Sequence, residues 1–236
     1  MAHKKIIFVI VEGPSDDEAL GLILSRIYEK AKVFVYIAHG DITTQAKPEN
    51  ILSRIADVIK GYAKSNHFTA KNFQKIIHIV DTDGAYIPNE AYIPNEAVKE
   101  DMSAENPIYS LTEIRTNNVA GIQRRNAVKS RCLDRISSVK TIWNIPYQAF
   151  YMSCNLEHVL HNKINSTSEE KENMALEFAK KYKENIKGFI EFMSKSSFSV
   201  SGDYSKTWQY IKTDLHSLER HTNIGGCLSN IYPAFL

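Results

Sequence analysis

The sequence contains few cysteines, little net charge and no long apolar run, and each of these shortages excludes a class of protein. The three cysteines, Cys132, Cys154 and Cys227, have no paired spacing, which argues against a disulfide framework or a zinc site. A formal net charge of +2 is too small to indicate a nucleic-acid binder, so any basic surface must arise from local clustering. The apolar run 6–11 is far too short to span a membrane and is not followed by a signal-peptide cleavage site. We therefore expect a cytoplasmic protein that has no membrane partner.

The 236 residues suffice for one large domain, or for one domain with a substantial extension. A hydrophobic content of 43% with 24% charged residues is typical of a soluble globular protein. The pattern of elements divides the chain into an α/β region, residues 1–165, and an α-helical extension, residues 166–236. In the extension, apolar residues recur at mostly helical spacing over 174–192, and a second run over 208–218 marks another helix.

Two apolar stretches end in acidic residues and a glycine. Residues 76–80 lead into Asp-Thr-Asp-Gly, with the acids at Asp81 and Asp83, and residues 6–11 lead into Glu12 and a glycine. Their β-branched and aromatic composition predicts strands that are covered on both faces. Asp-x-Asp-Gly by itself is explained equally well by a turn, where Asp and Gly are favoured. The acid at the end of a second strand favours instead one site built from both strand ends.

Helical patterns between the strands predict parallel strand–helix–strand units. Ser15 and Glu18 fit a capping box, and apolar residues then recur at helical spacing over 20–27. A strand at 33–37 and a helical pattern over 51–59 complete the connection to the second acid-ended strand. Parallel strands all end at one edge of a sheet, which is where open α/β sheets place ligands. The acids expected at that edge are Glu12, Asp41, Asp81 and Asp83.

Several carboxylates in one partly buried crevice repel one another, so they must hold protons or bind a hard cation. Oxygen ligands without a neighbouring histidine or cysteine favour Mg²⁺ or Mn²⁺ over zinc. Magnesium retains several waters and takes further ligands from phosphate groups. The acids at the strand ends therefore predict a magnesium or manganese site that works on a phosphate.

An apolar strand ending in Glu-Gly, followed later by one ending in Asp-x-Asp-Gly, resembles the two motifs of the TOPRIM domain, a fold shared by topoisomerases, primases and several nucleases. The resemblance covers about residues 4–160 and implies a Rossmann-like core with a mostly parallel sheet flanked by helices. By position it implies that Glu12 is the general acid/base or a metal ligand, and that Asp81 and Asp83 hold Mg²⁺. Asp16 matches an additional acid of the overcoming-lysogenization-defect nucleases, although an acid in a first helical turn also stabilises the helix dipole.

A further strand followed by an acid is predicted near the end of the α/β region. The strand at 146–152 is followed by a short polar turn and by Glu157, which opens an apolar helix. The segment resembles one in small TOPRIM proteins of phage-defence loci, which implies a metal-binding or substrate-orienting role for Glu157. An acid that stabilises the first turn of its helix is an equally good explanation.

Residues 119–137 predict a helix that carries a cluster of basic side chains. Its apolar face is formed by Ile122, Leu133 and Ile136, and the opposite face by Arg124, Arg131 and Arg135. The arginines of the opposite face are better explained as a solvated surface, and Arg124 remains a candidate contact to substrate. Arg125 and Lys129 fall on the apolar side, where a cation needs a carboxylate or phosphate partner.

The hexapeptide Ala-Tyr-Ile-Pro-Asn-Glu occurs twice in succession, at 85–90 and 91–96. Two copies cannot make a repeat fold, and Pro, Asn and Glu favour an exposed loop. We expect a loop insertion over about 84–106 that overhangs the site, with Tyr86 or Tyr92 able to stack on a base.

Together these features favour a Mg²⁺-dependent nuclease that hydrolyses phosphodiester bonds of RNA or DNA. The candidate catalytic residues are Glu12, Asp81, Asp83, Arg125 and Lys129. The candidate metal ligands are Glu12, Asp16, Asp81, Asp83 and Glu157, and the candidate substrate contacts are Asp41, Thr43, Arg124, Arg125 and Lys129. The small size, the absence of a Walker A loop and the Glu157 segment resemble defence effectors of the abortive-infection type, which implies a partner ATPase. The sequence leaves open a homodimer, a non-catalytic binding subunit with a structural cation, and a primase-like nucleotidyl transferase.

Overall fold

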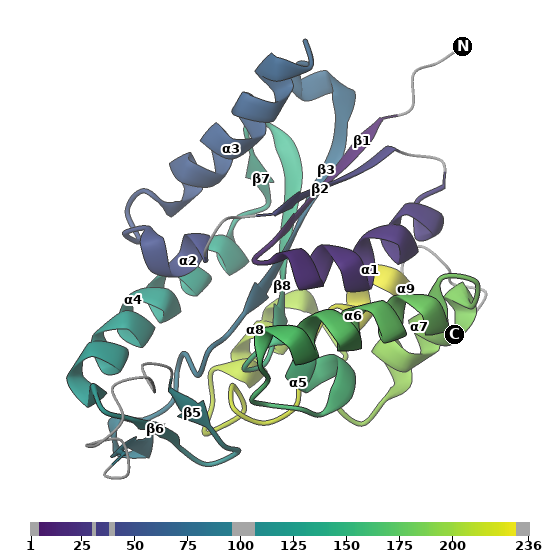
Figure 1. The fold of residues 1–236 in the computed structure, drawn as a ribbon. Helices are drawn as coiled ribbons and strands as arrows, with labels where there is room; N and C mark the ends of the chain where they lie inside the picture. The colour runs from purple at the N-terminus through teal and green to yellow at the C-terminus, as the bar shows by residue number, and fades with distance from the viewer. Residues whose placement is uncertain (1–4, 30–31, 38–40, 96–106, 230–236) are drawn as a thin grey trace.

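The computed structural model describes residues 5–29, 32–37, 41–95 and 107–229. A five-stranded sheet lies at its centre, in the order β2-β1-β3-β8-β7 (Figure 1). The strands are β1 (Ile6–Val11), β2 (Lys32–Ile37), β3 (Phe73–Asp81), β7 (Thr141–Ile142) and β8 (Ile145–Met152). Strands β2, β1, β3 and β8 run parallel, whereas β7 is antiparallel to its neighbour β8. The predicted α/β fold with a mostly parallel sheet is confirmed.

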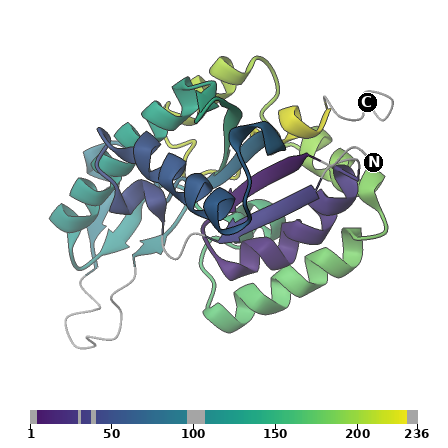
Figure 2. The same cartoon turned by 90° about the horizontal axis from the view of Figure 1, so that it is seen from above.

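The chain goes from β1 to β2 on one side of β1 and then crosses to β3 on its other side. This creates a topological switch point between β1 and β3. Helix α1 (Pro14–Ile27) leads from β1 to β2, and α3 (Ile51–Ser65) leads from β2 across β1 to β3. The two helices cover opposite faces of the sheet (Figure 2). The carboxyl ends of β1 and β3 therefore border a crevice of the kind in which open α/β sheets bind ligands.

Both faces of the sheet are covered, and successive residues of β1 contribute to alternate cores. The odd-numbered residues of β1 pack with α1, α6 (Ser168–Tyr182) and α7 (Ile186–Lys195). The even-numbered residues pack with α3, α4 (Val119–Ser138) and α8 (Tyr204–Ile211). Every residue of β1 is at most 2% exposed, which explains why its sequence is continuously apolar rather than alternating.

The helical C-terminal region packs on both faces of the sheet. Helix α6 lies along α1, and α8 packs against α4 (Figure 1). The apolar spacing over 174–192 forms two helices rather than one, because α6 ends at Tyr182 and α7 begins at Ile186. The short helices α5 (Leu156–His161) and α9 (Gly225–Ser229) complete this region. In the described part of the chain, no helix is long and apolar enough to cross a lipid bilayer.

The duplicated hexapeptide forms part of a small lobe, so the prediction of an exposed loop is wrong for its apolar residues, whereas residues 88–90 and Pro94 are exposed. Three short strands form a second sheet in the order β4-β6-β5. They are β4 (Tyr92–Pro94), β5 (Ile108–Tyr109) and β6 (Ile114–Thr116). Ile87 and Tyr92 are at most 8% exposed in the apolar cluster of this lobe, and the Tyr92 hydroxyl donates to the carbonyl of Gly84, so this ring cannot stack on a base. Residues 96–106 of the predicted insertion lie outside the described residues.

The start of α1 differs from the predicted capping box. The helix begins at Pro14, a residue favoured at the first helical position because its φ is already helical and it lacks an N–H. The carboxylate of Asp16 accepts two hydrogen bonds from the backbone N–H groups just before the helix, at 3.1 and 3.0 Å. The prediction that Ser15 and Glu18 form the box is therefore wrong, since the earlier start puts Asp16 at the third helical position.

His78 is a buried histidine in the middle of β3, and its Nδ1 lies 2.8 Å from the hydroxyl of Tyr147 on β8. Burial lowers the pKa of His78 to about 4, so the folded protein holds a neutral imidazole there. The unfolded chain, with an ordinary pKa of about 6.5, takes up a proton first as the pH falls. The folded state therefore loses stability between pH 6.5 and pH 4.

His78→Gln should remove this proton linkage. We expect the free energy of unfolding of wild type to fall by about 2 kcal/mol more than that of His78→Gln between pH 7 and pH 5, in EDTA. Urea unfolding at several pH values measures the difference. His67→Asn, which changes an exposed histidine, should keep the wild-type pH dependence. Equal slopes for wild type and His78→Gln would contradict the role of His78.

Candidate metal centre

The carboxyl ends of β1 and β3 lie side by side at the switch point, and each carries an acid. Glu12 follows β1 directly, and Asp81 is the last residue of β3. The backbone N–H of Asp81 donates a hydrogen bond to Glu12 Oε1, at 3.0 Å. The prediction that the two acid-ended strands meet at one edge of the sheet is confirmed.

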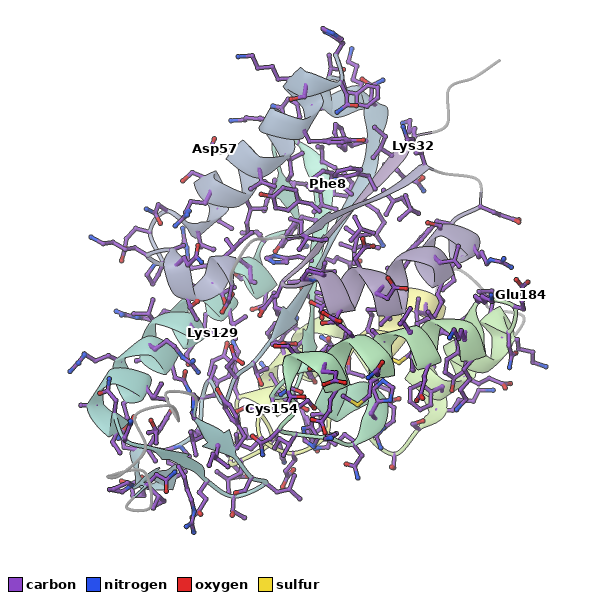
Figure 3. All side chains as sticks on the ribbon, in the orientation of Figure 1. Phe8, Lys32, Asp57, Lys129, Cys154 and Glu184 are labelled. Carbon is purple, nitrogen blue, oxygen red and sulfur yellow. The ribbon has the colours of Figure 1, made fainter. Side chains whose placement is uncertain are left out.

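Glu12, Asp41 and Asp83 form the first acid group, in which the carboxylate oxygens lie within 4.8 Å of one another. These residues come from the end of β1, the N-cap of α2 (Ile42–Gln45) and the turn after β3. Lys129 reaches into the group from α4 and is fully buried (Figure 3). The distances from its Nζ are 2.5 Å to Asp83 Oδ2, 2.7 Å to Asp41 Oδ2 and 3.7 Å to Glu12 Oε1. This cluster could hold a metal ion, and it already contains one ammonium group.

The positive charge of Lys129 does not compensate the three carboxylates of the first acid group equally. Burial opposes the charge on Lys129, but the surrounding carboxylates outweigh it and raise the pKa of Lys129 well above its usual value. Burial also opposes the charge on Asp41, yet the ammonium and two hydrogen bonds from Thr43 leave the pKa of Asp41 lowered. For Glu12, burial and repulsion by Asp41 prevail over the more distant ammonium and raise the pKa well above its usual value. Lys129 and Asp41 form an ion pair, whereas Glu12 is less fully compensated.

Asp81 belongs to the second acid group, together with Asp16 and Glu157. Burial and the charges of Glu12 and Asp16 raise the pKa of Asp81 well above its usual value. Burial likewise raises the pKa of Asp16 to about 6, although this carboxylate accepts two backbone hydrogen bonds. Glu157 is 4% exposed, and its Oε2 lies 3.2 Å from Nζ of Lys171 on α6. One lysine therefore lies beside the carboxylates of each acid group.

Two turns with left-handed backbone conformation bring the strand ends together. Asp83 (φ +48°) and Gly84 (φ +70°) follow β3, and Cys154 (φ +58°) follows β8. A Cβ at position 84 would lie 2.5 Å from the Ile114 side chain, so glycine is needed there for space as well as for its φ. The N–H of Asp83 donates to the carbonyl of Cys154 at 2.9 Å, which links the two turns.

Thr82, the central residue of the Asp-Thr-Asp sequence, strengthens this link from the inside. It is fully buried, and its hydroxyl donates to the carbonyl of Ser217 at 2.9 Å and accepts from the N–H of Cys154 at 2.7 Å. While Thr82 is held in the interior, Asp81 and Asp83 on either side of it line the cleft. The threonine thus orients the two acids that flank it.

The acids open into a single cleft of about 770 Å³. One wall is lined by residues of α4 and the small sheet, and the other by the start of α6 and the segment before it. Arg125 on the first wall donates to the hydroxyl of Tyr109 and to the side-chain oxygen of Asn126, both at 3.0 Å. The charged residues that line the cleft are Glu12, Asp81, Asp83, Arg125, Glu170 and Lys171. A ligand in the cleft would meet carboxylates between two walls that each carry a cation, Arg125 on one and Lys171, next to Glu170, on the other.

Several predicted residues do not line this cleft. Thr43 is fully buried, and its N–H and hydroxyl both donate to Asp41 Oδ1, so it orients Asp41. Asp41 faces Lys129 inside the first acid group. Arg124 is exposed on α4, and Tyr86 is half-buried with its hydroxyl bonded to α4. The structure therefore brings Glu12, Asp81, Asp83, Lys129, Asp41, Arg125 and Glu157 to one edge of the sheet and leaves Arg124 on the outside.

Four residues of the site, Lys171, Tyr109, Thr82 and Asn126, are absent from the predictions based on sequence. Asn126 donates to the Asp83 carbonyl at 2.9 Å and so ties α4 to the turn after β3. It lies on the apolar stripe of α4 with Lys129, and a polar residue on such a stripe is a signal that could have identified it. Lys171 has no such signal, because it stands among the charged residues at the start of α6.

Comparisons with known proteins do not assign the chain to a family. No protein-family model, no curated protein and no solved structure matches it. Function is therefore inferred from the residues and geometry of the site.

The chemistry of the donor set fits a hard divalent cation. The two acid groups supply six carboxylates, against three cations from Arg125, Lys129 and Lys171. The raised pKa values of Glu12 and Asp81 reflect burial together with repulsion between the acids, and a bound cation would offset both by replacing protons. Because the acid groups contain no histidine among the residues that the structure describes, the set suits magnesium or manganese.

Lys129→Met would remove the ammonium group from the first acid group. We expect the free energy of unfolding to fall by about 3–5 kcal/mol in EDTA, because the buried carboxylates lose their partner. Mn²⁺ should raise the melting temperature more in this variant than in wild type, since it then offsets the same charges. Thermal unfolding with and without Mn²⁺ measures both effects. Arg131→Met, on the exposed face of α4, is the matched control, and equal Mn²⁺ responses in Lys129→Met and wild type would refute the prediction.

Binding of a divalent cation should release protons, because burial and repulsion keep Glu12 and Asp81 protonated at higher pH than ordinary carboxylic acids. The affinity for Mn²⁺ should therefore rise with pH over the range in which these two acids ionise. Calorimetric titration in two buffers of different ionisation enthalpy counts the protons. We expect Asp81→Asn to bind Mn²⁺ at least about tenfold more weakly and to release fewer protons. Asp57→Asn, on the outer side of α3 (Figure 3), should match wild type, and a pH-independent affinity would argue against this site.

Proposed function

We propose that this protein is a Mg²⁺- or Mn²⁺-dependent nuclease that hydrolyses phosphodiester bonds in RNA or DNA. The observation that carries the proposal is the position of Glu12, Asp81 and Asp83 at the switch point of an open α/β sheet, in a cleft with Arg125 and Lys171 on its walls. Clustered carboxylates suit a hard cation, and the two wall cations suit the phosphate groups of a nucleic acid.

The two acids at the end of β3 would hold the cation. These are Asp81 and Asp83, with Glu157 and Asp16 behind them and Glu12 beside them. When bound, such a cation polarises a phosphoryl oxygen and makes a bound water more acidic. Lys129 holds Asp83 in place for this role, since its Nζ lies 2.5 Å from the carboxylate.

Two side chains of the site are suited to act on the substrate itself. Arg125 is held by Tyr109 and Asn126, so its planar guanidinium is oriented before a phosphate oxygen arrives and loses little freedom on binding. Glu12 has a raised pKa and lines the cleft, so it can accept and return a proton as the general acid/base. We assign it the proton transfer that accompanies cleavage.

The order of the acids and their strand context resemble the TOPRIM domain. On that resemblance alone we extend the proposal to a cytoplasmic anti-phage defence effector of the abortive-infection type that works with a partner ATPase.

A non-catalytic binding subunit is the second candidate, and one observation favours it. Lys129 already provides a cation inside the first acid group, so this group can be stable as a structural ion-pair network without chemistry. In that case the cleft would bind a nucleic acid or partner without cleaving it.

A cleavage assay separates the two candidates. Wild type is incubated with single-stranded DNA, duplex DNA or tRNA in Mg²⁺ or Mn²⁺. We expect cleavage that EDTA abolishes and that Glu12→Gln slows at least about 100-fold, because the general acid/base is lost. Arg125→Met should slow it by a similar factor through lost charge stabilisation.

Asp57→Asn is the matched control for these variants, since it changes an exposed acid away from the cleft and should cleave at the wild-type rate. Cleavage that persists unchanged in Glu12→Gln would refute catalysis in this cleft. Mn²⁺ binding by wild type without cleavage of any of the three substrates would favour the binding subunit.

A further inference from the structure

Lys171 stands at an unfavourable place for a lysine. Helix α6 begins at Ser168 with Thr167 as its N-cap, so Lys171 is the fourth helical residue and closes the first turn. The helix dipole disfavours a positive charge there and favours acids. The side chain nevertheless carries its ammonium to within 3.2 Å of Glu157 Oε2. The presence of a lysine at this position is therefore better explained by its contact with Glu157 than by any stabilisation of α6.

The ammonium of Lys171 compensates the charge of Glu157 in the second acid group. Glu157 is 4% exposed, and a carboxylate so deeply buried needs a cation beside it. Burial opposes the charge on Lys171, but Glu157 and Asp81 outweigh it and raise the pKa of Lys171 above its usual value. In the absence of a divalent cation, Lys171 supplies the positive charge that this group requires.

The two lysines of the site differ in how firmly they are held. Lys129 has no exposed side-chain surface and lies within 2.7 Å of two carboxylates. The side chain of Lys171 is 37% exposed, its ion pair with Glu157 is longer, and it lines the open cleft. Its flexible four-carbon stem can carry the ammonium from the acids into the cleft without any movement of α6. Lys129 is thus a fixed cation, whereas the ammonium of Lys171 can move away from the acids.

We propose that Lys171 is an exchangeable cation, which neutralises the second acid group until a divalent cation takes its place beside Glu157 and Asp81, and which then binds a phosphate of the substrate. The inference rests on the proposed function, since it requires a divalent cation and a phosphate-bearing substrate in this cleft. A divalent cation offers the same carboxylates twice the charge and repels the ammonium. The displaced ammonium meets the cleft in which Arg125 stands on the opposite wall.

The exchange couples the two binding events. The cation must compete with Lys171 for the acids, and once it is bound, Lys171 becomes available to the substrate. Binding of the cation should therefore strengthen binding of a nucleic acid, and by linkage the nucleic acid should strengthen binding of the cation. Without Lys171, the cation should bind more tightly and this part of the coupling should disappear.

Lys171→Met and Lys171→Arg test the exchange in the full chain. Mn²⁺ affinity is measured by calorimetry, and binding of a short single-stranded DNA with hydrolysis-resistant phosphorothioate linkages is measured by fluorescence anisotropy, with and without Mn²⁺. We expect Lys171→Met to bind Mn²⁺ roughly tenfold more tightly than wild type, because the competitor is gone. It should bind the DNA more weakly than wild type in Mn²⁺ and gain less from the cation. Lys171→Arg should stay close to wild type, as should Lys180→Met on the exposed face of α6.

Mn²⁺ binding that is no tighter in Lys171→Met than in wild type would overturn the exchange, as would failure of both proteins to bind Mn²⁺. Unchanged DNA affinity in Lys171→Met would overturn the contact with phosphate. Lys171→Gln, which can still donate a hydrogen bond to Glu157, serves if Lys171→Met does not fold, with the same expectations. Tighter Mn²⁺ binding in a protein whose wild type cleaves nothing would support the exchange and reject the nuclease, so the two failures are distinguishable.

Discussion

The buried ammonium of Lys129 is the contact on which the arrangement of this protein depends. It joins the end of β1, the start of α2 and the turn after β3, which are far apart in the sequence. A charge so deeply buried is tolerated only with its partners in place, so α4 must pack on the sheet in the register that brings Lys129 to them. The next turns of the same helix face place Leu133 and Ile136 in the core. The site and this core are therefore formed by the same packing of α4.

Charge compensation also divides the site into a fixed part and a changeable part. In the first acid group Lys129 is inaccessible and paired at short distance, whereas Lys171 in the second group is partly exposed and lines the cleft. Burial and the repulsion left between the groups raise the pKa of Glu12 and of Asp81, which are joined through the Asp81 N–H at the switch point. A divalent cation is the simplest way to relieve this repulsion, and a phosphate is the natural ligand for the cations on the cleft walls.

Much of the core could be predicted because its signals are local. Continuous apolar runs predicted β1 and β3, and the rule that parallel strands end at one edge of a sheet brought together Glu12 and the two acids at the end of β3. Helical periodicity placed Lys129 on the buried side of α4, although the same stripe also contained Asn126, which was missed. The sequence alone predicts a later start for α1, because Ser15 is a good N-cap residue. The helix begins instead at Pro14, which is favoured at the first helical position.

The sequence by itself determined which strands end in acids and which face of α4 carries the buried lysine, since both follow from the periods of strands and helices. Only the tertiary structure decided that Tyr92 is buried, because its lobe is completed by apolar residues from distant parts of the chain. The pairing of Glu157 with Lys171 was likewise decided only by the docking of α6, since nothing near Lys171 in the sequence marks it as part of a site. Local sequence patterns specify the helices and strands and their buried faces. Two charged residues that are far apart in the sequence can pair only after the packing of those elements has brought them together.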